Sequence, residues 1–340
     1  MKRRMVVKRH MYAGLWVGAL AWLAAGAGST PPLRLRAAIP LPAVQGRIDH
    51  FDADVAGHRV FMSALGNNTV EVFDTAAGKL TATLRGVREP QGVAYAPRSH
   101  RLFVASAADG TCRVFDGRTL RLLKTIPFSS DADDTRYDAA SNRVFVGYGE
   151  AGDAGLAILD GSTGALVAKI ALPDHPESFQ LDPGGARVYV NIPDAGNIIA
   201  VVDRERRRIA ATWRLGGAQD NFPMALDAAD HRLFVICRNP AEMLALDTAS
   251  GRIVARVPCA GDADDVWYDA ARRRIYVTGG SGDITVIQQS GADGYSRLAQ
   301  IASRPGARTS LFVPQWRELF LGLRREGGQP AELRVYAAQP

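Results

Sequence analysis

The sequence predicts an all-β fold, a seven-bladed β-propeller of four-stranded antiparallel blades whose last blade is closed by an N-terminal strand. First, an arginine followed by an apolar strand recurs at intervals of 42 to 45 residues. The copies begin at Arg59, Arg101, Arg143, Arg187, Arg232, Arg274 and, with glutamate in place of arginine, Glu318. Second, nearly every repeat contains four short runs rich in Val, Ile, Phe and Tyr, separated by turn residues. Third, no segment after the leader has helical periodicity of useful length. Four strands repeated at this interval are typical of propeller blades.

The first element, residues 1–27, is predicted to be an export signal. Basic residues crowd its first nine positions, and the apolar run of residues 11–27 ends in Ala25-Gly26-Ala27. Small residues there favour cleavage before Gly28. The segment "RRMVVK" at residues 3–8 partly matches a twin-arginine signal, so both the Sec and the twin-arginine routes stay open. An uncleaved anchor is the alternative, although 17 residues are few for a bilayer span. We therefore expect a periplasmic or secreted protein without a stable membrane span, in which residues 28–340 form a single domain.

The charge balance limits the kinds of partner that the protein is expected to bind. The formal net charge is +6, but the leader carries five basic residues and no acidic one, which leaves about +1 for the rest. A nucleic-acid partner is therefore not expected, because it needs a positive groove with stacking aromatic residues. Cys112, Cys237 and Cys259 are odd in number, so at least one has no partner within the chain. Cys112 is expected to be a small buried residue. A disulfide between Cys237 and Cys259 stays open in an oxidising compartment.

Within each repeat the strands follow one order. The first precedes the arginine, as in "TRYD" and "VWYD", and the second is the arginine strand itself. The third ends mostly in aspartate, as in "TVEVFD", and the fourth follows a turn, as in "KLTATL". His58, His100 and His231 stand directly before a repeat arginine, in the turn between the first two strands. We interpret these three histidines as structural turn residues.

The last repeat is incomplete. Residues 309–337 supply only three strands, whereas the segment "LRLRAAIPLP" at Leu33–Pro42 resembles the outer strand of a blade. We predict that this N-terminal strand completes the seventh blade. Such closure pairs an otherwise open sheet edge and ties the ring into one domain. The protein is expected to be a monomer.

Two strand pairs carry a family resemblance. "RVYVN" followed by "IAVVD", and "RIYVT" followed by "ITVIQ", resemble the YVTN-type repeat of YncE-like β-propellers, over essentially the whole chain after the leader. WD40 propellers are a poorer match because no Trp-Asp closes the third strands. The resemblance implies the fold but no single activity, since such propellers occur as binding modules, surface proteins and domains of redox enzymes. Some relatives carry a haem or quinone on a separate domain or partner. The sequence has no CxxCH, so covalent c-type haem is not expected.

An acidic motif, "DADD", occurs at residues 131–134 and again at 262–265. The two copies are three repeats apart and occupy the same loop, which joins the outer strand of one blade to the inner strand of the next. In a propeller these loops converge on one mouth of the central channel. Such a concave mouth is the default ligand site.

The repeats align two positions of this loop, ten and nine residues before each repeat arginine. They are occupied by Asp49 and His50, Gln91 and Gly92, Asp133 and Asp134, Glu177 and Ser178, Phe222 and Pro223, Asp264 and Asp265, and Arg308 and Thr309. Several carboxylates at one mouth repel one another unless a cation, a shared proton or an arginine offsets them. The predicted ligand-binding residues are Arg47, Asp49, His50, Gln91, Asp133, Asp134, Arg136, His175, Glu177, Asn221, Asp264, Asp265 and Arg308.

Two histidines, His50 and His175, lie in the mouth loops and could serve as metal ligands or general bases. The hypothetical ligands of a divalent metal ion are His50, His175, Asp133, Glu177 and Asp264. Carboxylates suit Ca²⁺ or Mg²⁺, whereas histidine admits Zn²⁺, Cu²⁺ or Fe.

The arginines of the loops, Arg47, Arg88, Arg136 and Arg308, leave two alternatives open. They could neutralise the acids and form a satisfied polar plug. Arg47 and Arg308 could instead clamp a carboxylate or phosphate. Trp267 and Phe222 could line the mouth, but packing between blades is the expected role for both.

Three functions follow from these observations. The first is an exported binding module that holds a small polar ligand or a metal ion at the mouth. The second is a metal-assisted hydrolase or lyase, lactonase-like, with His50 or His175 as the base. No nucleophile elbow or Ser-His-Asp motif supports an enzyme, so catalysis stays open. The third is an interaction scaffold, with another periplasmic protein as the partner.

Overall fold

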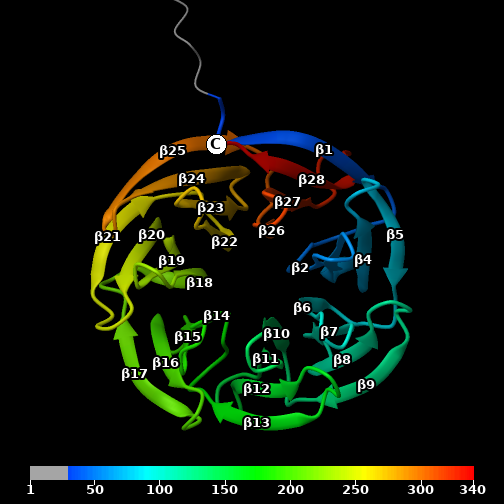
Figure 1. The fold of residues 1–340 in the computed structure, drawn as a ribbon, viewed down its shortest axis with the longest axis horizontal. Helices are drawn as coiled ribbons and strands as arrows, with labels where there is room; N and C mark the ends of the chain where they lie inside the picture. Colours follow the sequence, from blue (N-terminus) through cyan, green and yellow to red (C-terminus); the bar gives the residue numbers. More distant parts are fainter. Residues whose placement is uncertain (1–29) are drawn as a thin grey trace, which may run out of the picture. The chain divides into compact units, whose positions relative to one another are not determined.

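The computed structural model describes residues 30–340, of which residues 31–340 form one compact unit. In this unit, seven four-stranded sheets surround a central channel (Figure 1). Every pairing between neighbouring strands whose register is described is antiparallel, for example β2 (Phe51–Asp54) with β3 (Arg59–Ala64). The predicted all-β, seven-bladed propeller is therefore confirmed. The predicted leader, residues 1–27, lies outside the described residues. Among the described residues, no helix has the length and apolar character needed to span a membrane.

Each of the first six blades runs in chain order from an inner strand beside the channel to an outer strand at the rim (Figure 1). Besides β2 and β3, blade one has the short helix η1 (Leu65–Asn67), β4 (Thr69–Asp74) and β5 (Lys79–Leu84). Blades two and three contain β6 (Pro90–Ala96), β7 (Arg101–Ser106), β8 (Thr111–Asp116), β9 (Leu122–Pro127), β10 (Ala132–Asp138), β11 (Arg143–Tyr148), β12 (Gly155–Asp160) and β13 (Leu166–Ala171). Blades four to six contain β14 (Ser178–Leu181), β15 (Arg187–Ile192), β16 (Ile198–Asp203), β17 (Arg208–Arg214), β18 (Gln219–Asp227), β19 (Arg232–Asn239), β20 (Ala241–Asp247), β21 (Ile253–Pro258), β22 (Ala263–Asp269), β23 (Arg274–Gly279), β24 (Asp283–Ser290) and β25 (Gly294–Ala302).

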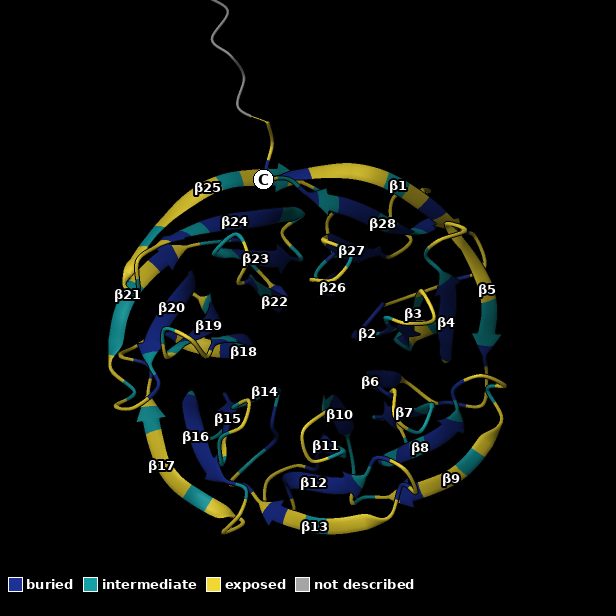
Figure 2. Ribbon diagram, in the orientation of Figure 1, coloured by how far each residue is buried: buried dark blue, intermediate teal, exposed yellow. Residues whose placement is uncertain are grey.

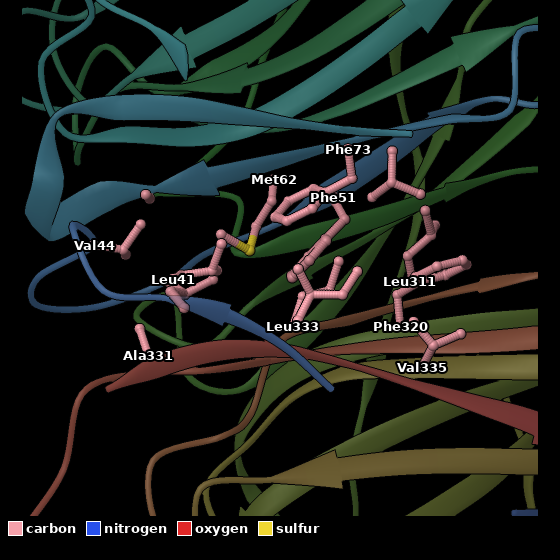
Figure 3. Close-up of a cluster of buried hydrophobic side chains, with 14 of the residues drawn as sticks. Leu41, Val44, Phe51, Met62, Phe73, Leu311, Phe320, Ala331, Leu333 and Val335 are labelled. Atoms are coloured by element: carbon pink, nitrogen blue, oxygen red, sulfur yellow. The ribbon is translucent and has the colours of Figure 1, made fainter. Parts of the chain in front are cut away.

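Blade seven joins the two ends of the propeller chain. Its strands are β26 (Ser310–Val313), β27 (Glu318–Leu323), β28 (Ala331–Ala338) and, outermost, β1 (Leu33–Leu41). The pairing of β1 with β28 runs from Leu33 opposite Ala338 to Leu41 opposite Ala331. The predicted closing strand is thus confirmed, one residue shorter than expected. Leu41 and Leu333 of this blade pack with Phe51 and Met62 of blade one in a common core (Figure 3).

The middle strands of each blade are buried on both faces because neighbouring blades stack against them. β23 and β27 are buried along nearly their whole length, whereas exposed residues predominate in the outer strand β17 (Figure 2). This is why the second and third runs of each repeat are continuously apolar and do not alternate.

The turns of each blade alternate between the two faces of the ring. The turn between the first two strands contains His58, His100 or His231, with φ of 50°, 52° and 55°. These positive angles confirm that the three histidines are turn residues. In a four-stranded meander, the loop between strands two and three and the loop to the next blade then share the opposite face, which is the face of the mouth.

The three cysteines are free, so the pairing of Cys237 with Cys259 that the sequence left open is not formed. Cys237 lies on β19 and Cys259 directly follows β21, with β20 hydrogen-bonded between these two strands. Strands two places apart in a sheet are separated by about 9.5 Å. That separation exceeds the reach of a disulfide, about 7 Å between Cα atoms.

Candidate functional site

The mouth of the channel contains a cavity of about 260 Å³, here called the mouth cavity. Seven of the predicted ligand-binding residues line it: Arg47, Gln91, Asp133, His175, Glu177, Asp264 and Arg308. Asp131, Glu150, Asp194, Phe222 and Arg238 complete the lining. The lining is almost entirely polar and ionisable, which suits an ion or a very small polar ligand.

The first residue of each acidic motif shapes the backbone. Asp131 and Asp262 have φ of 27° and 51°, and the equivalent Glu89 and Asp220 have φ of 46° and 56°. Few residues other than glycine, asparagine and aspartate adopt such angles at low cost. The turn therefore explains part of the acidic composition that the sequence shows at this position.

The last residue of each acidic motif joins neighbouring blades. Asp134 accepts a hydrogen bond from the backbone N–H of Phe179 at 3.4 Å, and Asp265 accepts one from Ser310 at 2.7 Å. Both carboxylates are buried and neither lines the mouth cavity. Burial raises the pKa of Asp134 to about 6, against the opposing charges of Arg136 and His50. Asp134 and Asp265 thus hold the ring together, and only the third residues, Asp133 and Asp264, line the cavity.

His50 is buried among carboxylates and does not line the mouth cavity. Its Nδ1 lies 3.4 Å from Oδ1 of Asp265, and its Nε2 lies 3.6 Å from Oδ1 of Asp49. Burial acts to lower the pKa of His50, but these two carboxylates outweigh it and raise the pKa well above its ordinary value. Burial also raises the pKa of Asp49 to about 7, although His50 and Arg47 oppose the shift. His50 is therefore the cation of a buried charge cluster.

One half of the mouth cavity consists of arginines gathered around Asp264. Nη2 of Arg238 lies 2.8 Å from Oδ1 of Asp264, and Nε of Arg308 lies 2.9 Å from Oδ2. Despite burial, these two arginines lower the pKa of Asp264. The guanidinium of Arg238 also stacks on the ring of Phe222, 3.5 Å from its centre. In this half the arginines neutralise the acid, as one of the alternatives from the sequence anticipated.

The other half brings Asp133, His175 and Glu177 together. Each offers one ligand atom, and these atoms lie within 4.8 Å of one another. Nδ1 of His175 lies 2.7 Å from the carbonyl oxygen of Gly149, and its Nε2 lies 3.5 Å from Oδ2 of Asp133. If Nδ1 donates to that carbonyl, a neutral ring presents its Nε2 lone pair to a carboxylate. A proton or a metal cation between the two makes this contact favourable, and a second hydrogen bond of this kind is typical of metal-bound histidines.

The charge of this half is poorly compensated. Asp133 is only 6% exposed, and its Oδ1 has no hydrogen-bond partner among the described residues. Burial and the charge of Asp133 raise the pKa of Glu177 to about 8. Burial acts to lower the pKa of His175, but its hydrogen bond to Asp133 and the charges of Asp133 and Asp131 raise it to about 10. Both groups retain protons that a bound cation would replace.

A second possible group, Asp131 with Glu150 and His175, is less suitable. Nδ1 of His175 lies 3.9 Å from Asp131, but this nitrogen already contacts Gly149. Glu150 is also exposed to solvent. Of the five predicted metal ligands, the structure therefore brings together Asp133, His175 and Glu177. Within residues 30–340, His50 and Asp264 belong to neither group.

Like Asp49, His50, Asp134 and Asp265, two further predicted residues do not line the mouth cavity. Arg136 lines a different cavity of the channel and is held by Asp134. Asn221 is fully buried, and its amide donates to Asn191 at 2.8 Å and to the carbonyl of Ile198 at 3.0 Å. Asn221 thus connects blades four and five and does not line the mouth cavity.

Sequence reasoning missed Glu150, Asp194 and Arg238 because it considered only the loops between blades. These three residues lie at or between the second and third strands of their blades. The alternation of turns in a meander places those loops on the same face as the loops between blades. Counting turns along each repeat could have identified all three.

No protein-family model matches the chain, and a search of the curated proteins found no match. The seven-bladed fold therefore stands on its strands and their pairing alone. A ring of this kind, with variable loops around one channel, suggests a binding or scaffold module.

Proposed function

We propose that the chain is a metal-binding propeller module that holds a divalent cation at the mouth through Asp133, His175 and Glu177. One observation carries the proposal: Nε2 of His175 faces Asp133, whose other oxygen is buried without a hydrogen-bond partner. A buried carboxylate in this state is costly unless a cation binds it.

The ligand set favours Zn²⁺ over Ca²⁺ or Mg²⁺. Zn²⁺ binds imidazole nitrogen and carboxylate oxygen together, whereas Ca²⁺ and Mg²⁺ prefer oxygen ligands alone. Three protein ligands leave one position open in a tetrahedral site. The mouth cavity gives a small polar ligand access to that position, and Arg47, Arg238 and Arg308 line the same cavity.

The proposal also covers the family of the protein and its location in the cell. The repeat strands support membership of the YncE-like, YVTN-repeat propellers, and the basic and then apolar start of the sequence supports export to the periplasm or beyond. Determining the N-terminal residue of the protein recovered from producing cells would test the export signal. We expect Gly28, and an intact Met1 would contradict cleavage.

Metal titration of the chelator-treated full chain tests the site. We expect Zn²⁺ to bind at one site, to raise the melting temperature and to release protons, because the ligands must lose theirs. Calorimetry in buffers of different ionisation enthalpy would measure that release. Asp133→Asn and His175→Gln should each weaken binding about tenfold or more.

Asp194→Asn provides the matched control. It removes the same charge from an exposed residue of the same cavity that is not among the three ligands. Its Zn²⁺ affinity should stay near that of the unaltered chain. Equal weakening by all three variants would mean that only the general charge of the mouth attracts cations. Absence of any binding would overturn the proposal.

A further inference from the structure

A second cavity, of about 340 Å³, lies in the channel on the inner strands, and is here called the channel cavity. Its lining includes Phe51, Asp52, Thr135, Arg136 and Trp267. No lining residue is shared with the mouth cavity. Along blade one, Arg47 lines the mouth cavity and Asp52 lines the channel cavity, with the buried Asp49 and His50 between them in the chain.

The walls of the channel cavity are largely apolar and aromatic. Nε1 of Trp267 donates a hydrogen bond to Oγ of Ser310 at 3.1 Å, which fixes the plane of the indole. Phe51, Val93 and Leu311 line the cavity with it. An apolar cavity of this volume with a few polar groups is typical of sites for small organic molecules. In this respect the channel cavity differs from the smaller and polar mouth cavity.

Two opposite charges line the channel cavity without forming an ion pair with each other. Asp52 accepts backbone hydrogen bonds from Ala53 at 2.8 Å and Tyr95 at 2.6 Å, and forms no ion pair among the described residues. Arg136 is bound through Nη1, by Asp134 and by the carbonyl of Thr135. Its Nε and Nη2 have no hydrogen-bond partner in residues 30–340.

A third polar group lacks a partner. Oγ1 of Thr135 is buried and has no hydrogen bond within the described part of the chain, and Thr135 lines the same cavity. The channel cavity therefore combines a carboxylate without an ion pair, one cation with unused donors, an unsatisfied hydroxyl and an aromatic wall.

We propose that the channel cavity binds a free α-amino acid with an aromatic or branched apolar side chain. The ammonium group would contact Asp52, the carboxylate would accept from Nε and Nη2 of Arg136, and the side chain would pack against Trp267. A ligand with only a carboxylate would leave Asp52 unpaired, and one with only an amine would leave the donors of Arg136 unused. A zwitterion satisfies both groups and keeps the cavity neutral.

Calorimetry on the full chain tests this proposal, with L-phenylalanine and L-leucine as probes. We expect saturable binding of at least one probe. Phenylalanine methyl ester, which lacks the carboxylate, and 3-phenylpropionate, which lacks the amine, should each bind about tenfold more weakly or less. Glycine, which lacks the side chain, should not bind. These comparisons use the unaltered protein and need no variant to fold.

Variants then assign the contacts. Asp52→Asn and Arg136→Lys should each weaken phenylalanine binding about tenfold, because asparagine lacks the charge and lysine lacks the fork of donors. Binding should change the tryptophan emission of the unaltered chain, and Trp267→Phe should abolish that change. Zn²⁺ affinity should be unaltered in Asp52→Asn, and phenylalanine affinity should be unaltered in Glu177→Gln, so the two proposals can fail separately.

Several results would overturn the proposal. One is the absence of binding of either probe at about 10 mM, which would nearly saturate a site with a dissociation constant of about 1 mM. Another is equal binding of phenylalanine, its ester and 3-phenylpropionate, which would indicate apolar partitioning alone. A third is unchanged phenylalanine affinity in both Asp52→Asn and Arg136→Lys variants that melt normally.

Discussion

Neighbouring aspartates of the acidic loops have different roles because the backbone turns each side chain to a different place. Asp262 has a positive φ, Asp264 lines the mouth cavity and Asp265 accepts a backbone hydrogen bond from the next blade. The pairing of β22 with β23 shifts register between Ala263 and Asp265. A bulge of this kind redirects successive side chains and breaks the alternation expected of a strand.

The turn role can be tested at Asp220, the equivalent position in blade five. Asp220 is exposed, has φ of 56° and donates its N–H to Oδ1 of Asn197 at 2.7 Å. Asp220→Val should lower the free energy of unfolding by about 1–2 kcal/mol, because a β-branched residue is strained at this angle. Asp220→Gly and Asp220→Asn should cost far less. Urea denaturation of the three variants measures the difference, and equal losses would show that the charge matters and the angle does not.

At the scale of single residues, the sequence predicted only part of the candidate site. The repeat alignment placed Asp133, Glu177 and Asp264 on one mouth, since ten residues before each arginine is a constant place on the ring. It could not separate Asp134 or Arg136 from them, because the register shift between Ala132 and Thr135 decides which side chain turns inward. The approach of His175 to Asp133 depends on tertiary structure that no spacing reveals.

At the scale of elements, inner and outer strands differ in what they contribute. Outer strands such as β17 face solvent and mainly complete the sheets, so their sequences can vary. β1 is the exception, because it closes the ring by pairing with β28 and packs into the core shared by blades seven and one (Figure 3). Its place was predictable because the last repeat lacked one strand, and an open sheet edge is costly to leave exposed.

Two leucines of the closing strand β1, one buried and one exposed, provide a matched comparison. Leu41 is 1% exposed and lies in the shared core, whereas Leu35 on the same strand is 50% exposed. Leu41→Ala should lower the free energy of unfolding by about 2–5 kcal/mol, as large-to-small changes in cores do. Leu35→Ala should change it by less than about 0.5 kcal/mol. Chemical denaturation followed by circular dichroism compares them, and similar effects would mean that β1 is not part of the cooperative core.

At the scale of the whole molecule, the channel concentrates buried carboxyl groups, and most of those with a shifted pKa have it raised, whereas the arginines around Asp264 lower its pKa. Burial is the first cause of the raised pKa of Asp49, to about 7, of Asp52 and Asp134, each to about 6, and of Glu177, to about 8. In the turns between the third and fourth strands the shifts are opposite: hydrogen bonds from turn backbones lower the pKa of Asp116 and Asp203. Carboxylates of the turns between the third and fourth strands therefore favour the charged form, whereas most central carboxyl groups with a shifted pKa, Asp264 excepted, favour the neutral form.

This distribution predicts how the stability of the metal-free protein depends on pH. Between the ordinary carboxyl pKa of about 4 and the raised values, the folded chain retains protons that the unfolded chain has lost. The free energy of unfolding must then fall as pH rises from about 5 to about 8. His175 acts in the same direction, because the stability from its raised pKa is complete below about 6.5 and is lost as pH approaches about 10. Below pH 4 the carboxylates of these turns become protonated and their contribution is lost, so the optimum lies near pH 5.

Melting temperatures measured in chelator from pH 4 to pH 9 test this prediction. The midpoint should decline between pH 5 and pH 8, and Glu177→Gln should decline less, because it removes the carboxyl with the highest of these raised pKa values, about 8. Saturating Zn²⁺ should flatten or reverse the slope above pH 6, since a cation beside Glu177 favours its charged form. A melting temperature that rises from pH 5 to pH 8 without metal would show that the central carboxylates are already ionised and paired. In that case the channel would need no cation, and the case for a metal at the mouth would fail with it.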